Sequence, residues 1–332
     1  MARPRSAHVT EVKAALTARL DGRFGHPGGR FLSARAVAQR FTVSYQTAHR
    51  LLDELKAEGR LQREPASGTF LPGQRVTLRG AQLIFHRRAQ RKGSFGAHLM
   101  KMIEARLDEH GIDFVRSWWD ERKGGRLLSD RYPILWECPG AEREALQRRQ
   151  FALLLNDRPP AGLAGAYIDA VTTDDFSGGA CAAELLKQQT GSKGAFAVLG
   201  GPREDERNVQ RIAGFKAHAN VTQVICADSW FVESGREHVS TLLSGKPAGI
   251  FACNDRLAQA VLEHCRAHHL SVPLVGFDNA PVAERLRLTT IGIPWEAFVA
   301  HVMEKILARL SGSNAKASIV SLSHDVVLRL TT

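Results

Sequence analysis

From residue 82 onward, short apolar runs alternate with segments whose apolar residues recur at helical spacing, and this alternation most constrains the fold. Two parallel strands need a crossover connection, usually a helix. The pattern therefore favours an α/β fold with parallel sheets and helices on both faces. Strands are expected at 82–85, 114–118, 133–136, 151–156, 195–200, 223–227, 249–253, 273–277 and 289–293. Helices are expected at 95–110, 177–190, 209–218, 234–243, 255–268 and 296–310. Residues 116–131 lack a clear pattern, so the second strand–helix unit is expected to be reduced.

Polar groups are concentrated just after the expected strands, where parallel sheets bind their ligands. The segments are His86-Arg87-Arg88, Asp174-Asp175, Gly200-Gly201-Pro202-Arg203, Asn254-Asp255 and Asp278-Asn279. These donors and acceptors suit a hydroxyl-rich ligand. The run of Arg87, Arg88, Arg91 and Lys92 suggests an anionic ligand, but a solvated charge run near the DNA-binding domain is the favoured interpretation.

The first 72 residues follow another pattern. Residues 8–20 predict an amphipathic helix, and Ser33 and Ser44 are suited to cap a second and a third helix. One face of the third helix is apolar, with Ala48, Leu51, Leu52 and Leu55. The opposite face carries Tyr45, Gln46, His49, Arg50 and Asp53.

Gly59 is placed to end the third helix. Residues 60–63 and 69–71 then predict two short strands around a turn at 65–68. Helices followed by a hairpin form the layout of a winged helix, whose last helix fits the major groove of DNA.

The net charge of +11 is concentrated near the N-terminus. Residues 1–80 hold 14 of the 45 Lys and Arg residues and 6 of the 34 Asp and Glu residues, a net charge of +8. The remaining residues carry +3. A basic module joined to a nearly neutral domain is typical of a protein that binds a polyanion.

Residues 31–71, FLSARAVAQRFTVSYQTAHRLLDELKAEGRLQREPASGTFL, resemble the GntR-type winged helix. The resemblance includes both helices, the Glu58-Gly59 stop and the Gly68-Thr69-Phe70 end of the wing. It implies DNA contacts by Arg35, Ser44, Thr47 and Gly68. Tyr45 and His49 stand where the family usually has arginines, which implies a different operator. Base discrimination is expected from Tyr45, Gln46, His49 and Arg50.

A second resemblance covers roughly residues 82–330. TTDDFSGGACAAELL, VLGGPREDERNVQRIAGF, GIFACNDRLAQAVLEHC, VPLVGFDNAP and LTTIGIPWEAF resemble, in order, the LacI/GalR-type effector domain. It implies a two-lobed fold of the periplasmic sugar-binding kind. Its ligand residues would be Arg211, Asn254 and Asp278, with Ser177 and Arg87 as further candidates. Arg211 would donate to ligand hydroxyls, Asp278 would accept from them and Asn254 would do both.

The expected domains are a winged helix at 1–73, a linker at 74–81 and an effector-binding and dimerisation domain at 82–332. We expect a sequence-specific regulator, a repressor by family analogy, that binds double-stranded operator DNA as a homodimer and responds to a small sugar-like effector. Five cysteines without a CxxC pair favour a cytoplasmic protein. No apolar run approaches the ~20 residues that span a bilayer.

Two alternatives stay open: an effector domain that only dimerises, and a sugar-active enzyme fused to a DNA-binding domain. No catalytic, metal or cofactor site is expected. His264 and His268 have metal-compatible spacing but no evident third ligand, and Ser323-His324-Asp325 is a contiguous string, which is no evidence for a triad.

Overall fold

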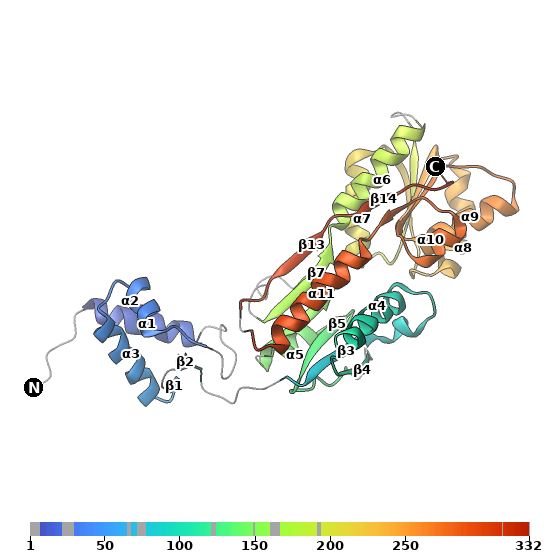
Figure 1. The fold of residues 1–332 in the computed structure, drawn as a ribbon. Coiled ribbons are helices and arrows are strands. Elements are labelled where there is room, and N and C mark those ends of the chain that lie inside the picture. Colours follow the sequence, from blue (N-terminus) through green and yellow to red (C-terminus); the bar gives the residue numbers. More distant parts are fainter. Residues whose placement is uncertain are drawn as a thin grey trace, which may run out of the picture. The chain divides into compact units, whose positions relative to one another are not determined.

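The computed structural model describes residues 7–21, 30–64, 68–71, 78–120, 124–148, 150–159, 167–190, 194–313 and 315–331 (Figure 1). The turn at 65–67 and residues 74–77 of the expected linker lie outside the described residues.

The N-terminal part is a winged helix. Its helices α1 (Ala7–Asp21), α2 (Ala34–Arg40) and α3 (Tyr45–Ala57) precede strands β1 (Gln62–Glu64) and β2 (Gly68–Phe70), which pair antiparallel. The expected apolar face of α3 lies at the centre of this fold. Its core consists of Val12, Leu16, Ala34, Val37, Ala48, Leu51, Leu52, Leu55, Leu61 and Leu71.

The ends of α3 follow the residues that the sequence places there. The Ser44 side chain accepts a hydrogen bond from the Thr47 amide at α3, as Ser33 does from Ala36 at α2. At the other end Gly59 has a φ of +71°, and the Arg60 amide donates back to the Leu55 carbonyl. This is a Schellman stop, in which glycine avoids the Cβ clash of the left-handed conformation.

The first large sheet has six strands in the described part of the chain. In spatial order they are β4 (Phe114–Trp119), β3 (Gly80–His86), β5 (Arg131–Trp136), β6 (Ala152–Leu155), β7 (Ile168–Thr173) and β13 (Ile319–Leu322). The pairs β3–β4, β3–β5 and β5–β6 are parallel. Along the chain, η1 (Arg87–Gln90) and α4 (Phe95–Glu109) lie between β3 and β4, and α5 (Ala141–Gln147) lies between β5 and β6. Helix α11 (Trp295–Leu310) precedes β13.

The second large sheet also has six strands among the described residues. In spatial order they are β9 (Val221–Cys226), β8 (Phe196–Gly200), β10 (Gly249–Ala252), β11 (Leu274–Asp278), β12 (Thr290–Gly292) and β14 (Asp325–Val327). Only β14 is antiparallel among the pairs described.

Helices cover both faces of the second sheet (Figure 1). Alternate residues of β8 show this, because Ala197 and Leu199 pack under α8 (Val232–Ser244) and α9 (Asp255–Ala267). Phe196 and Val198 face the opposite layer, α6 (Asp175–Thr190) and α7 (Glu206–His218). The short α10 (Pro281–Leu286) follows β11. The predicted parallel α/β architecture is confirmed.

The chain forms two compact units, each assembled from separate segments. One unit runs up to His86 and includes Arg106–Ala170 and Val302–Ile319. The other contains Arg87–Ala105, Val171–His301 and the residues from Val320 onward. Repeated passage of the chain between two α/β units is the two-lobed organisation that the second resemblance implies.

A buried ion pair joins distant segments of the first unit. Asp169 on β7 accepts hydrogen bonds from Arg309 Nε at 2.9 Å, the Tyr132 hydroxyl at 3.0 Å and the Ser318 amide at 3.0 Å. The Arg309 guanidinium lies over the Phe151 ring. Because each group is buried or paired, this cluster fixes α11 against the sheet.

All nine expected strands and six expected helices of the α/β region are present, with ends shifted by at most three residues. The prediction missed β7, β13, β14, α5 and α10. Strands β13 and β14 are sheet edges with largely exposed side chains, so they carry no apolar run. No helix lies among the described residues between β4 and β5, as the weak pattern at 116–131 predicted.

Candidate functional sites

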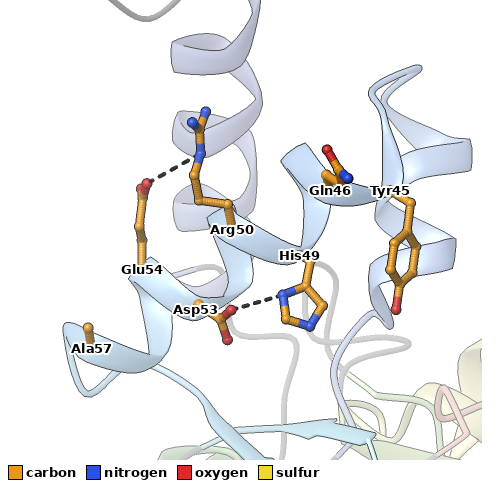
Figure 2. A pocket seen from close by; sticks show the side chains of 7 residues that line it. All are labelled: Tyr45, Gln46, His49, Arg50, Asp53, Glu54 and Ala57. Atoms are coloured by element: carbon orange, nitrogen blue, oxygen red, sulfur yellow. Dashed lines mark ion pairs between the residues drawn. The ribbon is translucent and has the colours of Figure 1, made fainter. Parts of the chain in front are cut away.

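The polar face of α3 forms an open hollow of about 460 Å³. Figure 2 shows its lining residues, which come from successive turns of the helix: Tyr45, Gln46, His49, Arg50, Asp53, Glu54 and Ala57. Tyr45 is 53% exposed, and the Gln46 side chain makes no hydrogen bond with the described residues. Tyr45 and Gln46, in the first turn of the helix, therefore present polar groups that the fold does not use.

The start of α3 is more constrained. The Ser44 hydroxyl oxygen accepts from the Thr47 amide at 3.1 Å and lies 2.9 Å from the Thr47 hydroxyl. Ser44 therefore acts first as a helix cap, and it satisfies one of the amides of the first turn that have no partner within the helix.

Asp53 connects α3 to the wing. Its carboxylate lies 2.9 Å from His49 Nδ1 and also accepts a hydrogen bond from Arg63 on β1. Partial burial raises the pKa of Asp53, but the Arg63 and His49 contacts outweigh this effect and hold the pKa below its ordinary value. The carboxylate therefore stays ionised at neutral pH.

Two further residues of the expected DNA surface flank α3 in the sequence. Arg35 is exposed in the first turn of α2, and its side chain makes no hydrogen bond or ion pair with the described residues. Gly68 begins β2 with a φ of +130°, and a Cβ there would lie 3.2 Å from Arg30 Nε. Any side chain at Gly68 would be strained, so only its backbone can approach a partner.

Arg211 on α7 is the centre of a buried charge cluster in the second unit. Its side chain is 3% exposed. Nε donates to Asp175 at 2.7 Å, and Nη1 donates to the Cys253 carbonyl at 2.7 Å and to Asp278 at 3.1 Å. The guanidinium carbon lies 3.8 Å from the centre of the Phe277 ring. Its other terminal nitrogen, Nη2, makes no hydrogen bond with the described residues.

Asp278 ends β11 with a φ of +99°, and its carbonyl accepts from the Trp295 indole. Burial, the largest influence, raises the pKa of its carboxyl to about 6; the Arg211 charge opposes this and Asp175 adds to it. Arg211 and Asp278, which the sequence nominated separately, are thus brought into direct contact.

Of the other expected ligand residues, Asn254 and Ser177 form hydrogen bonds within the protein and Arg87 is exposed. Asn254 caps α9, since its Oδ1 accepts from the Leu257 amide and its Nδ2 donates to the Trp230 carbonyl. The Ser177 hydroxyl donates to Asp174 at 2.8 Å. Arg87 is exposed in η1. Within the same basic run, Arg91 pairs with Glu233 at 2.7 Å.

Sequence reasoning missed three members of the Arg211 cluster as site residues. Asp175 is its closest carboxylate partner, and the polar segment Asp174-Asp175 was the signal for it. Phe277 lies beneath the guanidinium. The Trp230 ring is 5.6 Å away and fills the space beside Gly201, where a Cβ would clash with it. Phe277 stands next to Asp278 in the VPLVGFDNAP segment, which was the signal for it, whereas Trp230 lies in none of the quoted motifs.

Within the described ranges, no group of three or more His, Cys, Asp or Glu side chains is arranged to hold a metal ion. None of the helices in these ranges has the length and apolarity needed to cross a membrane.

The periplasmic binding protein-like domain family matches residues 192–332. The HTH-type transcriptional regulator DegA of Bacillus subtilis is 31% identical over 266 residues, covering 72% of this chain and 77% of that protein. The arabinose metabolism transcriptional repressor of Geobacillus stearothermophilus is 25% identical over 303 residues, covering 81% of each chain.

Solved structures share the fold of the α/β region. A LacI transcriptional regulator from a Rhodococcus species matches with a TM-score of 0.63 and 24% identity, over 76% of this chain and 97% of that one. A LacI family regulator from Enterococcus faecalis with bound ribose matches with a TM-score of 0.64 and 20% identity, over 76% and 98%.

Proposed function

The chain belongs to the LacI-type family of helix-turn-helix transcriptional regulators, and from this premise we propose an operator-binding repressor whose DNA affinity is set by a small hydroxyl-rich effector. The observation that supports DNA binding is the exposed polar face at the start of α3, where Tyr45 and Gln46 form no hydrogen bonds through their side chains with the described residues. A helix that enters the major groove needs free donors and acceptors there, and Gln46 and Tyr45 offer them.

We propose that the DNA-binding domain is of the GntR type. The hairpin β1–β2 directly after α3 supports this, together with the resemblance of residues 31–71. Tyr45, Gln46, His49 and Arg50 would read base edges. Arg35, the α3 start at Ser44 and Thr47, and the Gly68 backbone would contact phosphates, which position the protein without reading sequence.

The effector half rests on the Arg211 cluster. Arg211 Nη2 would donate to a ligand hydroxyl, and the second oxygen of Asp278 would accept from one. The side chains of Asn254 and Ser177 would contribute less, because they are already hydrogen-bonded within the fold. Arg87 would contribute less because it is exposed in η1. A buried site of this kind rejects ligands without the matching hydroxyls. Ribose bound to the Enterococcus faecalis relative makes pentoses and hexoses the first candidates.

We further propose that the protein is a cytoplasmic homodimer, in which each winged helix binds one half of a near-palindromic operator. The winged helix would comprise residues 1–73, the linker 74–81, and the effector-binding and dimerisation domain 82–332. Effector and DNA would then change each other's affinity by the same factor.

Selection of bound fragments from a genomic library, with and without candidate sugars, tests this proposal. We expect enrichment of a palindromic sequence and loss of enrichment with one sugar. Gln46→Ala should weaken binding, whereas Gln188→Ala, which changes an exposed glutamine of α6, should not. Equal binding of all duplexes at physiological salt would refute the regulator. A thermal-shift screen in which no sugar stabilises the protein would instead favour a domain that only dimerises.

A further inference from the structure

The contact between His49 and Asp53 fixes where the imidazole carries its proton. His49 Nδ1 lies 2.9 Å from Asp53 Oδ2. An ionised carboxylate can only accept a hydrogen bond, so a contact this short requires the hydrogen on Nδ1. In the neutral ring the other nitrogen, Nε2, then carries a lone pair and acts as an acceptor.

Arg63 holds this arrangement from outside the helix. Its Nη1 donates to Asp53 Oδ1 and also lies 3.4 Å from His49 Nδ1, a longer contact than the 2.9 Å between His49 Nδ1 and Asp53 Oδ2. The Arg63 side chain is 20% exposed, compared with 45% for His49 and 49% for Asp53. The wing strand thus supplies the least exposed of the three side chains, and the imidazole stays accessible to a partner. Figure 2 shows His49 and Asp53 joined along the face of α3 that carries Tyr45.

We infer that His49 reads an exocyclic amino group in the major groove through Nε2, and that Asp53 and Arg63 position it to do so. The inference rests on the proposed function. Only adenine N6 and cytosine N4 present amino donors there, while guanine N7 and O6 and thymine O4 are acceptors. An arginine, which the GntR-type family usually has at this place, donates to guanine. The histidine therefore inverts the hydrogen-bond polarity of the position.

The Asp53 carboxylate determines that His49 Nε2 is an acceptor and not a donor. In Asp53→Asn the amide oxygen can keep the bond from Arg63, which turns the amide NH₂ toward His49. That donor favours the tautomer with the hydrogen on Nε2, which then donates. Cytosine should no longer be preferred at the position, and guanine or thymine should be accepted there, because guanine N7 and O6, thymine O4 and adenine N7 can all accept from Nε2. If Asp53 were purely structural, its replacement would lower affinity without this change in base preference.

The experiment uses the full chain and an operator selected from a random duplex library. Each adenine of the operator is replaced by purine and each cytosine by 2-pyrimidinone, which removes one amino group at a time. One replacement should weaken wild-type binding about tenfold, as expected for a good base contact. In His49→Ala the same replacement should cost less than twofold. Glu58→Gln is the matched control, because Glu58 pairs with Lys13 and does not line the hollow on the polar face of α3, and it should retain the wild-type pattern.

The outcomes separate the two proposals. If no sequence is enriched, the regulator itself fails. If an operator is enriched but every amino deletion costs wild type and His49→Ala equally, the reading by His49 is wrong. A guanine-to-7-deazaguanine replacement that weakens binding by wild type but not by His49→Ala would also overturn it, because His49 would then be a donor. Retention of the wild-type base preference by a folded Asp53→Asn variant would refute the positioning role.

Discussion

Replacement of Arg211 by methionine should destabilise the second unit strongly. Methionine fills similar space without charge, and leaves the Asp175 and Asp278 carboxylates and the Cys253 carbonyl without their donor. Removal of one partner from a buried ion pair costs about 3–5 kcal/mol. A loss of this size corresponds to a fall in melting temperature on the order of 10 °C for a unit of this kind.

The pH dependence of this loss follows from Asp278. Its pKa is about 6 in the folded protein, against an ordinary value of 3.8. A carboxyl with a raised folded pKa leaves stability intact below its unfolded pKa and removes stability as pH rises through the folded pKa. Without Arg211 the pKa of Asp278 should rise further. The deficit of Arg211→Met should therefore be largest near pH 7 and shrink toward pH 5, where the carboxyl takes up a proton.

Urea unfolding followed by tryptophan fluorescence measures this effect, since Trp230 lies beside Arg211. Arg236→Met is the matched control, because Arg236 pairs with Glu263 at 2.7 Å at the surface and should change the midpoint little. A wild-type midpoint for Arg211→Met at pH 7 would refute the reasoning. A deficit that grows as the pH falls from 7 to 5 would contradict the assigned role of Asp278.

Further substitutions test the other elements. Gly59→Ala should lower the free energy of unfolding by about 1 kcal/mol, because its φ of +71° strains any side chain although a Cβ meets no atom within 4 Å; an unchanged urea midpoint would contradict this. Ser33→Ala and Ser44→Ala should each cost about 1 kcal/mol as lost helix caps, but in gel-shift assays Ser44→Ala should weaken DNA binding more, and equal affinities would argue against α3 as the reading helix. Asp169→Asn should destabilise by about 3–5 kcal/mol, since it removes the counter-charge of buried Arg309; a wild-type thermal melt would show that the pair is dispensable.

Local patterns predicted much of the architecture, because they depend on contacts within one element. The apolar face of α3, its Ser44 cap and its Gly59 stop are each encoded within a few residues. The same holds for buried strands such as β8, in which every residue is apolar or small. Arg211 and Asp278 could be nominated because each stands at a motif of the effector domain.

Which groups meet across the fold depended on the tertiary structure. Asp169 and Arg309 are 140 residues apart, and Asp175 and Arg211 are 36 apart, so no local pattern predicts either pair. The bond from Arg63 on β1 to Asp53 is likewise tertiary, whereas the contact of Asp53 with His49 is a local i,i+4 pair on α3. The sequence by itself determined the winged helix and the alternating strands and helices, since those follow from the spacing of neighbouring residues. Only the tertiary structure decided the partners of the buried charges, because a buried charge is stabilised by whichever distant segment supplies its counter-charge.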